Sequence, residues 1–492
     1  MSKRVRESAE VGRVVTVVDA DGVEWVSTSE VEFAPDMEEQ LSKLTASVAE
    51  VDESVSSKKL VSALEKKIQI NAQARIKYAG DAPKFIDTES DLYEQVVAMQ
   101  VIVNNPSLIP EILESNCANL MVQLLDHENS DISLAVIEWF RDIFDGEILE
   151  EVDEQQVANM VERAKSCQIA QAIVANLARF NENVEDDAKA VYSSMEFFEC
   201  MFDLDPTFVE YAGKESDLIH WLIKRLLEKP KMVRDDNRQY ASEILSIMVQ
   251  ECTLNQCICA GNGGMDMILK ALSYFRKADP TTENDKEAQQ NIFITLRALL
   301  LVPENCALFV KSEGIELMLM LIRRTPSLSA IPALKVIAFA ASSGEVCCNS
   351  IVDASGLSVL FPIFLSPAIL CAGKAKASDV SQINESVSSI FCSLLRFCKN
   401  EKIVRVVNKF REDSYAKAIH AANLFVGMYL KVKDASDSAK NSSVGELWLD
   451  SGTFPLLLLF LEGAPRNFVN RSLILVIQAL RLCSRWPWSV RF

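Results

Sequence analysis

Histidine is the residue type most often used for acid–base chemistry, and this 492-residue sequence contains three: His127, His220 and His420. A catalytic triad needs a histidine close to a nucleophile and a carboxylate. His127 falls in a polar turn, His220 precedes a tryptophan in an apolar helical pattern, and His420 lies in an alanine-rich helical segment. We predict structural or solvent-exposed roles for all three and no enzymatic activity, so no catalytic residue is assigned.

Thirteen cysteines could form disulfides or bind metal, but most stand singly within apolar helical patterns. The closest groupings, Cys257 with Cys259 and Cys347 with Cys348, lack a second pair or a histidine at zinc-ligand spacing. We interpret them as buried free thiols and predict no metal and no cofactor. The sequence begins without an apolar signal-peptide core, which favours a reducing cytosol or nucleus.

One glycine-rich segment and one apolar segment invite comparison with a phosphate-binding loop and a membrane span. Residues 261–264, Gly-Asn-Gly-Gly, follow a predicted helix and not a strand, so they indicate a turn and not a phosphate-binding loop. The longest apolar run, residues 454–461, stops at Glu462 and is shorter than a membrane span requires. We therefore expect no membrane contact.

The charge balance indicates which partners the chain prefers. A net charge of −19 and an isoelectric point near 4.8 argue against a nucleic-acid-binding protein, because phosphate contacts need clustered Lys and Arg. Acidic clusters at 145–154 and 182–187 could receive a basic peptide, or they could be solvated loops. We expect protein partners with basic segments and no direct nucleic acid; the alternative is that the charge only maintains solubility.

The elements that carry these residues are predicted to be helices. The chain has only 16 glycines and 15 prolines, about half the share of an average globular protein, and 49% hydrophobic residues. The first 35 residues differ, since residues 14–18 and 23–26 flank an Asp-Gly turn and predict a β-hairpin. From Met37 onward apolar residues recur every three or four positions.

A repeated block divides the helical part. Asn305 stands nine residues before Gly314, which opens an apolar helix, and Asn255 bears the same relation to Gly264. Equivalent positions are Ala118, Asp217, Gly264, Gly314, Gly356 and Gly452. Consecutive separations are 99, 47, 50, 42 and 96 residues, so each long interval is expected to hold two periods. A period in the forties is typical of armadillo and HEAT repeats, with glycine accepting a left-handed conformation between helices.

The predicted fold is all-α: an armadillo/HEAT-like right-handed superhelical solenoid with a short N-terminal appendage. Further breaks are predicted near 229–231, 278–283 and 372–381. The predicted organisation is a flexible or β-hairpin appendage (1–35), an N-terminal helical cap (36–90), armadillo-like repeats (91–433), a mobile loop (434–446) and a C-terminal helical repeat or cap (447–492).

Ordered blocks of residues resemble the beta-catenin-like protein 1 family of nuclear, spliceosome-associated armadillo proteins. The longest is Leu125-Asp126-His127-Glu128-Asn129-Ser130-Asp131-Ile132 with its continuation to Val136. The other blocks lie at 52–54, 75–78 with 83–85, 221–226, 242–245, 314–318, 333–336, 360–364 and 408–410. The likeness runs from about Val51 to Phe410 and then weakly through 449–452; the hairpin and the last forty or so residues depart from it.

This resemblance implies a non-catalytic nuclear component of pre-mRNA splicing that contacts a Prp-nineteen-type complex. It also implies that one face of the solenoid binds basic nuclear-localisation-type segments of splicing factors, including a CDC-five-like protein. The alternative is a cytoplasmic armadillo/HEAT adaptor or transport factor without a splicing role. A general import receptor is disfavoured, because Trp139 and Trp221 lack the asparagine four residues later that such receptors use. The oligomeric state, self-association included, stays open.

Overall fold

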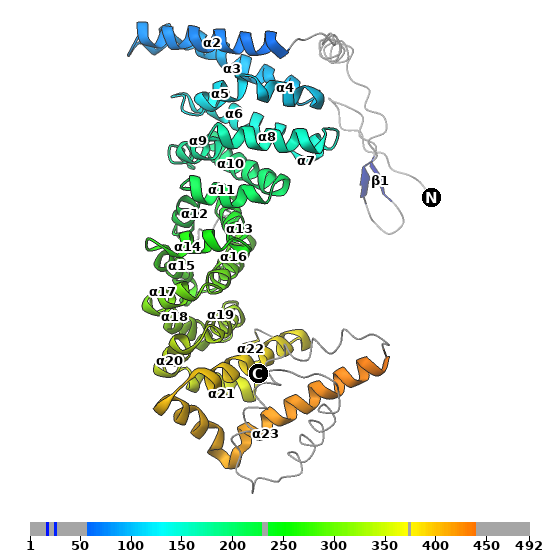
Figure 1. Cartoon of the computed structure of the whole chain (residues 1–492), viewed down its shortest axis with the longest axis vertical. Helices are drawn as coiled ribbons and strands as arrows, with labels where there is room; N and C mark the ends of the chain where they lie inside the picture. Colours follow the sequence, from blue (N-terminus) through cyan, green and yellow to red (C-terminus); the bar gives the residue numbers. More distant parts are fainter. Residues whose placement is uncertain (1–15, 19–23, 27–56, 229–234, 372–374, 439–492) are drawn as a thin grey trace.

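A computed structural model describes residues 16–18, 24–26, 57–228, 235–371 and 375–438 of the chain (Figure 1). Between Ile109 and Phe397, the described residues form six repeats of three helices each. The first helices are α4 (Ile109–Glu114), α8 (Glu154–Ser166), α11 (Thr207–Glu215), α14 (Thr253–Ala260), α17 (Pro303–Lys311) and α20 (Glu345–Asp353). The second helices are α5 (Cys117–Leu124), α9 (Ile169–Leu177), α12 (Leu218–Leu226), α15 (Gly264–Ser273), α18 (Gly314–Arg323) and α21 (Leu357–Leu365). The third helices are α6 (Ser130–Ile143), α10 (Glu185–Leu204), α13 (Asp236–Gln250), α16 (Glu283–Leu299), α19 (Ala330–Ser342) and α22 (Ala377–Phe397).

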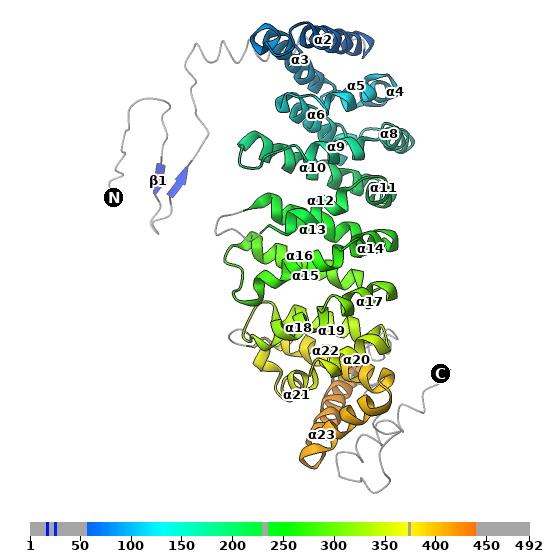
Figure 2. The same cartoon turned by 90° about the vertical axis from the view of Figure 1, so that its left-hand side faces the viewer.

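Like helices of successive repeats pack against one another, so the molecule is an elongated stack of three parallel rows (Figures 1 and 2). In the third row α6 packs on α10, α10 on α13, α13 on α16, α16 on α19, and α19 on α22. The second row joins α12, α15, α18 and α21, and the first joins α11, α14, α17 and α20. This arrangement is the all-α armadillo solenoid that the sequence predicts.

Additional elements flank the repeats. Before them lie β1 (Thr16–Val18), β2 (Glu24–Val26), α2 (Ser57–Lys77) and α3 (Ile86–Ala98), and after them lies α23 (Asn400–Ser438). A single short turn of helix, α7 (Gly146–Leu149), follows α6. Five 3₁₀ turns are η1 (Ala82–Lys84), η2 (Met99–Ile102), η3 (Pro106–Leu108), η4 (Tyr274–Arg276) and η5 (Pro367–Leu370). The two strands pair antiparallel with Val17 opposite Trp25, which confirms the predicted hairpin; its turn lies outside the described residues.

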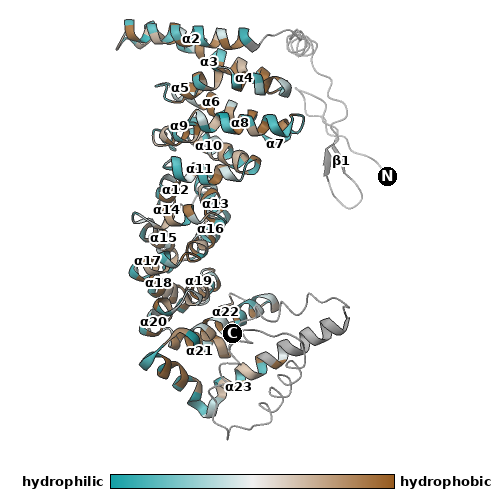
Figure 3. Cartoon of the chain, in the orientation of Figure 1, coloured by the Kyte–Doolittle hydropathy of each residue, from teal (hydrophilic) through white to brown (hydrophobic). Residues whose placement is uncertain are grey.

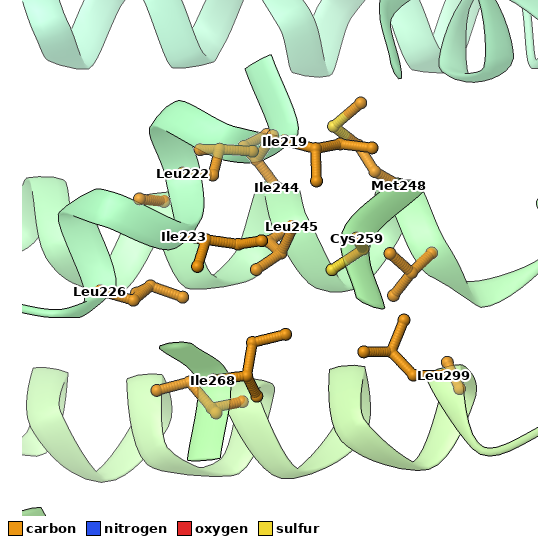
Figure 4. Close-up of a cluster of buried hydrophobic side chains, with 14 of the residues drawn as sticks. Ile219, Leu222, Ile223, Leu226, Ile244, Leu245, Met248, Cys259, Ile268 and Leu299 are labelled. Atoms are coloured by element: carbon orange, nitrogen blue, oxygen red, sulfur yellow. The ribbon is translucent and has the colours of Figure 1, made fainter. Parts of the chain in front are cut away.

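The core is continuous along the stack because each helix buries one apolar stripe between repeats. Apolar and polar residues are interspersed along the stack of helices (Figure 3). In the middle of the stack, apolar side chains of α12 and α13 meet those of α14, α15 and α16 (Figure 4). No repeat buries this surface alone, so neighbouring repeats stabilise one another.

The repeat phase predicted from glycines is confirmed by the start of the second helices. Gly264 and Gly314 are the first residues of α15 and α18, and Gly356 directly precedes α21. The first long interval does hold two periods, because α9 begins at Ile169, near the midpoint between Ala118 and Asp217. Gly452 lies outside the described residues.

The predicted reason for these glycines is wrong, since the left-handed residue is the one before each of them. It is Gly263 with φ 84°, Glu313 with φ 58° and Ser355 with φ 62°. The repeat glycines are needed for close packing. A Cβ on Gly264 would lie 1.9 Å from the carbonyl oxygen of Cys259, and one on Gly314 would lie 2.2 Å from the Phe309 ring.

Gly264→Ala should therefore lower the free energy of unfolding by about 1–3 kcal/mol, because the clash is with backbone that cannot rotate away. Urea denaturation followed by circular dichroism measures the change. Gly146→Ala is the matched control, since Gly146 also opens a helix and a Cβ there meets nothing within 4 Å. Equal effects of the two substitutions would contradict the steric explanation.

The repeat asparagines connect neighbouring helices through hydrogen bonds. The Asn255 side-chain amide donates to the carbonyl oxygens of Val209 (2.9 Å) and Met248 (3.0 Å). Asn305 repeats the pattern one unit later, with donation to the carbonyl oxygens of Gln256 and Leu299, both at 3.1 Å. Each amide thus joins its own first helix to the first helix and the third helix of the preceding repeat.

Two predicted boundaries need correction. The cap boundary at residue 90 falls inside α3, which packs on α6 and so continues the third row without a break. The three-helix pattern ends with α22 at Phe397, before the predicted limit at 433, because the following segment forms α23. Residues 412–415 interrupt α23 with non-helical dihedral angles.

The predicted loop at 434–446 is also corrected in its first residues. Helix α23 extends to Ser438, since residues 434–438 contain neither proline nor glycine to end it. Helix α22 likewise begins at Ala377, inside the break predicted at 372–381, whereas the break at 278–283 does separate η4 from α16. The rest of the loop, the 447–492 segment, the 229–231 break and the helical periodicity before Ser57 lie outside the described residues.

Candidate functional site: an acidic pocket on the third helices

A pocket of about 590 Å³ opens on the third-helix row where α6, α10 and α13 lie side by side. Carboxylates and two tyrosines dominate its lining, with one cation. The lining residues are Arg141, Asp142, Asp145, Tyr192, Glu196, Glu199, Cys200, Asp203, Gln239, Tyr240 and Glu243. The lining therefore contains six carboxylates and a single guanidinium, so the pocket has a strongly negative potential.

Helix α10 supplies the central stripe of the pocket. Tyr192, Glu196, Glu199 and Asp203 are spaced by four, three and four residues, which places them on one face of the helix. The opposite face is buried in the core, where Phe197, with T-shaped contacts to Phe140 and Phe144, holds α10 against α6. The apolar face of α10 thereby fixes the direction of the polar one.

Arg141 bridges α6 and α10. Its guanidinium donates to Asp142 Oδ1 from Nε (2.8 Å) and Nη2 (2.6 Å), and to Glu196 Oε2 from Nη1 (3.1 Å). Gln100 also donates to Asp142. These bonds compensate Asp142 and Glu196 near α6, whereas Glu199 accepts a hydrogen bond from Tyr240 of α13 and Glu243 belongs to α13 itself.

The two tyrosines connect α10 to α13. Their ring centroids are 5.0 Å apart, and the Tyr240 hydroxyl donates to Glu199. Tyr240 is buried, whereas Tyr192 keeps 39% of its surface exposed. The buried ring therefore fixes the position of the exposed one.

The raised pKa values of four lining residues reflect both their burial and the negative charge of the pocket. Burial, together with Asp145, Glu199 and other nearby carboxylates, raises the pKa of the Cys200 thiol to about 11. Burial and then Glu199 and Glu287 raise the pKa of Glu243 above its ordinary value. Tyr192 and Tyr240 have raised pKa values for the same two reasons, burial and neighbouring carboxylates. A bound cation would relieve this repulsion.

Buried ion pairs anchor the helices beside the pocket. Arg225 of α12 donates to Glu182 at 2.6 and 2.8 Å and to Asp235 at 2.7 Å. Arg238 of α13 donates to Asp285 of α16 at 2.7 Å, with side-chain exposures of 1% and 5%. These contacts set the spacing of α13 from its neighbours in the stack.

The two acidic clusters predicted from sequence are mostly structural. Asp145 and Asp153 accept hydrogen bonds from backbone N–H groups at the starts of α7 and α8, and of that cluster only Asp145 lines the pocket. In the second cluster Glu182 accepts hydrogen bonds from Arg225, and Asp187 accepts a hydrogen bond from the Asn181 N–H. The residues that sequence reasoning missed are those of the α10 stripe, which its four-three-four spacing could have indicated.

The histidines and cysteines lie away from the pocket, apart from Cys200. His127 contacts Asn71 Oδ1 at 3.2 Å and accepts from the Asn129 N–H, and His420 packs edge-on against Phe364. Burial lowers the pKa of both imidazoles. The twelve cysteines that the structure describes are free thiols. Among the same residues, no group of three or more His, Cys, Asp or Glu could hold a metal ion.

Within the described ranges, no single helix has the length and hydropathy to cross a bilayer. Two bent helix pairs reach that threshold only when their halves are combined, at Ile86–Ile102 with Pro106–Glu114 and at Glu345–Asp353 with Leu357–Leu365. Trp139 is buried and donates to the Met99 carbonyl oxygen, so it does not line the surface of the third-helix row.

Solved structures of armadillo proteins resemble the chain at low similarity. A designed armadillo repeat protein covers 70% of the chain with a TM-score of 0.33 and 11% identity. A structure from a study of the cadherin and beta-catenin interaction covers 88% with a TM-score of 0.37 and 14% identity. The assignment of the fold rests on the three helix rows described above.

Sequence relatives are much closer. Mouse beta-catenin-like protein 1 is 32% identical over 390 residues, which cover 79% of this chain and 68% of the mouse protein. The human protein is 32% identical over 370 residues, and the chain spans 64% of its length. The fission yeast homolog, from Schizosaccharomyces pombe, is 28% identical over 390 residues, with 78% and 66% coverage. Residues 35–446 match the family described as catenin-beta-like, Arm-motif containing nuclear, and the chain therefore belongs to that family.

Proposed function

We propose that this chain is a non-catalytic armadillo scaffold of the nuclear pre-mRNA splicing machinery. In this role it binds basic, nuclear-localisation-type segments of splicing factors, a CDC-five-like protein of a Prp-nineteen-type complex among them. The acidic pocket on α6, α10 and α13 is the observation that carries the proposal. Family membership supplies the context, because the relatives are named as beta-catenin-like proteins and the family as nuclear.

The pocket has the properties that a basic segment requires. The third-helix row presents one continuous surface, as the packing of each third helix on the next shows. An extended peptide can follow such a row across several repeats, since each repeat adds one more binding position. Electrostatic attraction from a chain of net charge −19 raises the rate of association with a cationic segment.

The test is affinity purification of the tagged full chain from nuclease-treated cell extract. Spliceosomal proteins, including a CDC-five-like factor, should be recovered without RNA, because the proposed contacts are between proteins. Imaging of the same tagged chain should show nuclear signal. Consistent absence of splicing factors, or exclusively cytoplasmic signal, would favour the alternative of a cytoplasmic adaptor or transport factor.

A further inference from the structure

We propose that the acidic pocket binds an arginine side chain of its partner in preference to a lysine side chain. The inference rests on the proposed function, since it specifies which basic residue the pocket selects. Three features of the pocket carry it: a partly exposed tyrosine packed against a buried one, carboxylates from two helices, and a resident arginine that shows how one guanidinium bridges carboxylates of this pocket.

The exposed ring favours a planar cation. The Tyr192 ring lies 5.0 Å from the ring of the buried Tyr240, whose hydroxyl is in turn held by Glu199, so the partly exposed Tyr192 can receive a ligand without a large entropic cost. A guanidinium stacks on an aromatic face through both its charge and its flat shape, whereas an ammonium offers charge alone. The long arginine stem can also cover the tyrosine pair with its methylene groups.

The carboxylates favour a branched donor. Glu199 and Asp203 extend from α10 and Glu243 extends from α13, so acceptors border the pocket on two sides. The five N–H donors of a guanidinium lie in one plane and can reach acceptors on both helices at once. The ammonium of lysine is a compact, strongly hydrated charge and loses more hydration for each contact that it makes.

The resident Arg141 shows the same mode of binding at the other end of the pocket. It donates two hydrogen bonds to Asp142 of its own helix and one to Glu196 of α10, so one guanidinium spans two helices. Its charge leaves most of the lining carboxylates uncompensated. An incoming arginine between α10 and α13 would extend this pattern by one helix and would bring a positive charge to Glu243, whose pKa is raised first by burial and then by Glu199 and Glu287.

Binding of two matched probe peptides tests the inference. One is a fluorescein-labelled peptide of alternating arginine and glycine, and the other has lysine in place of every arginine. Fluorescence anisotropy with the full chain at about 150 mM salt, where distant charges are screened, gives both dissociation constants. The arginine peptide should bind at least about fivefold more tightly. Tyr192→Ala and Glu243→Gln should each bring this ratio close to one, and Tyr192→Phe, which keeps the ring, should preserve it.

Matched controls separate the pocket from the general acidity of the surface. Tyr93 of α3 has 41% of its surface exposed, much like Tyr192, and Glu210 of α11 is an exposed carboxylate outside the pocket. Tyr93→Ala and Glu210→Gln should leave the ratio unchanged. Equal affinities for the two peptides, both weakened by the pocket variants, would overturn the arginine preference and keep the proposed function. Failure of both peptides to bind would overturn both.

Discussion

Replacement of Asp285 by alanine is expected to lower the free energy of unfolding of the central repeats by about 3–5 kcal/mol. The reason is that Arg238, with 1% of its side chain exposed, would lose the carboxylate that accepts its hydrogen bond between α13 and α16. Burial already lowers the pKa of Arg238, although Asp285 and Asp235 act in the opposite direction. Hydrogen exchange of α13 and α16, together with urea denaturation, measures the loss.

A double substitution provides the control for this prediction. Arg238→Met with Asp285→Leu removes both charges and keeps comparable volume, so it should cost much less than Asp285→Ala alone. A small cost of the double substitution would show that the loss of stability in Asp285→Ala comes from the uncompensated charge of Arg238. If Asp285→Ala cost less than about 1 kcal/mol, the pair would not be the anchor between these two third helices.

The repeat architecture could be predicted from sequence because its signals are local. Gly264, Gly314 and Gly356 each stand beside the first turn of a second helix, and that position is set by contacts within five residues. The predicted left-handed conformation of these glycines is wrong. A sequence shows only that a position lacks a side chain; it does not show whether a positive φ or a lack of space requires glycine there. Glu313 accepts a positive φ without being glycine, so no composition rule marks it.

The pocket could not be predicted in the same way, since its residues come from three repeats. Asp142, Glu199 and Glu243 are far apart in sequence, and only the packing of α6, α10 and α13 joins them. Dense acidic runs are the more visible signal in the sequence. Glu182 shows why such runs mislead. It lies in a run of acidic residues but accepts hydrogen bonds from Arg225, whereas the pocket carboxylates of α10 are spaced by the helical period.

Neutralisation of three pocket carboxylates should weaken basic-peptide binding by about 100-fold. The variant Glu199→Gln, Asp203→Asn, Glu243→Gln keeps side-chain size, and the loss of about 1 kcal/mol for each ionic contact gives that factor. Anisotropy with the arginine–glycine peptide measures it. Because the contacts are ionic, added salt should weaken binding to the wild-type chain and change binding to the variant much less.

The same variant should leave the fold equally stable or slightly more stable, which distinguishes a binding site from a structural cluster. A carboxyl whose pKa is raised in the folded state, as that of Glu243 is, destabilises the fold once it is ionised at neutral pH. Removal of this charge should therefore leave the free energy of unfolding unchanged or raise it slightly. Glu210→Gln with Glu251→Gln and Glu304→Gln, at exposed positions outside the pocket, causes the same change in net charge and should preserve binding. If the pocket variant lost both stability and binding, these carboxylates would be holding the helices together. If it loses binding alone, the carboxylates of the third-helix row serve to bind a cationic partner and not to stabilise the fold.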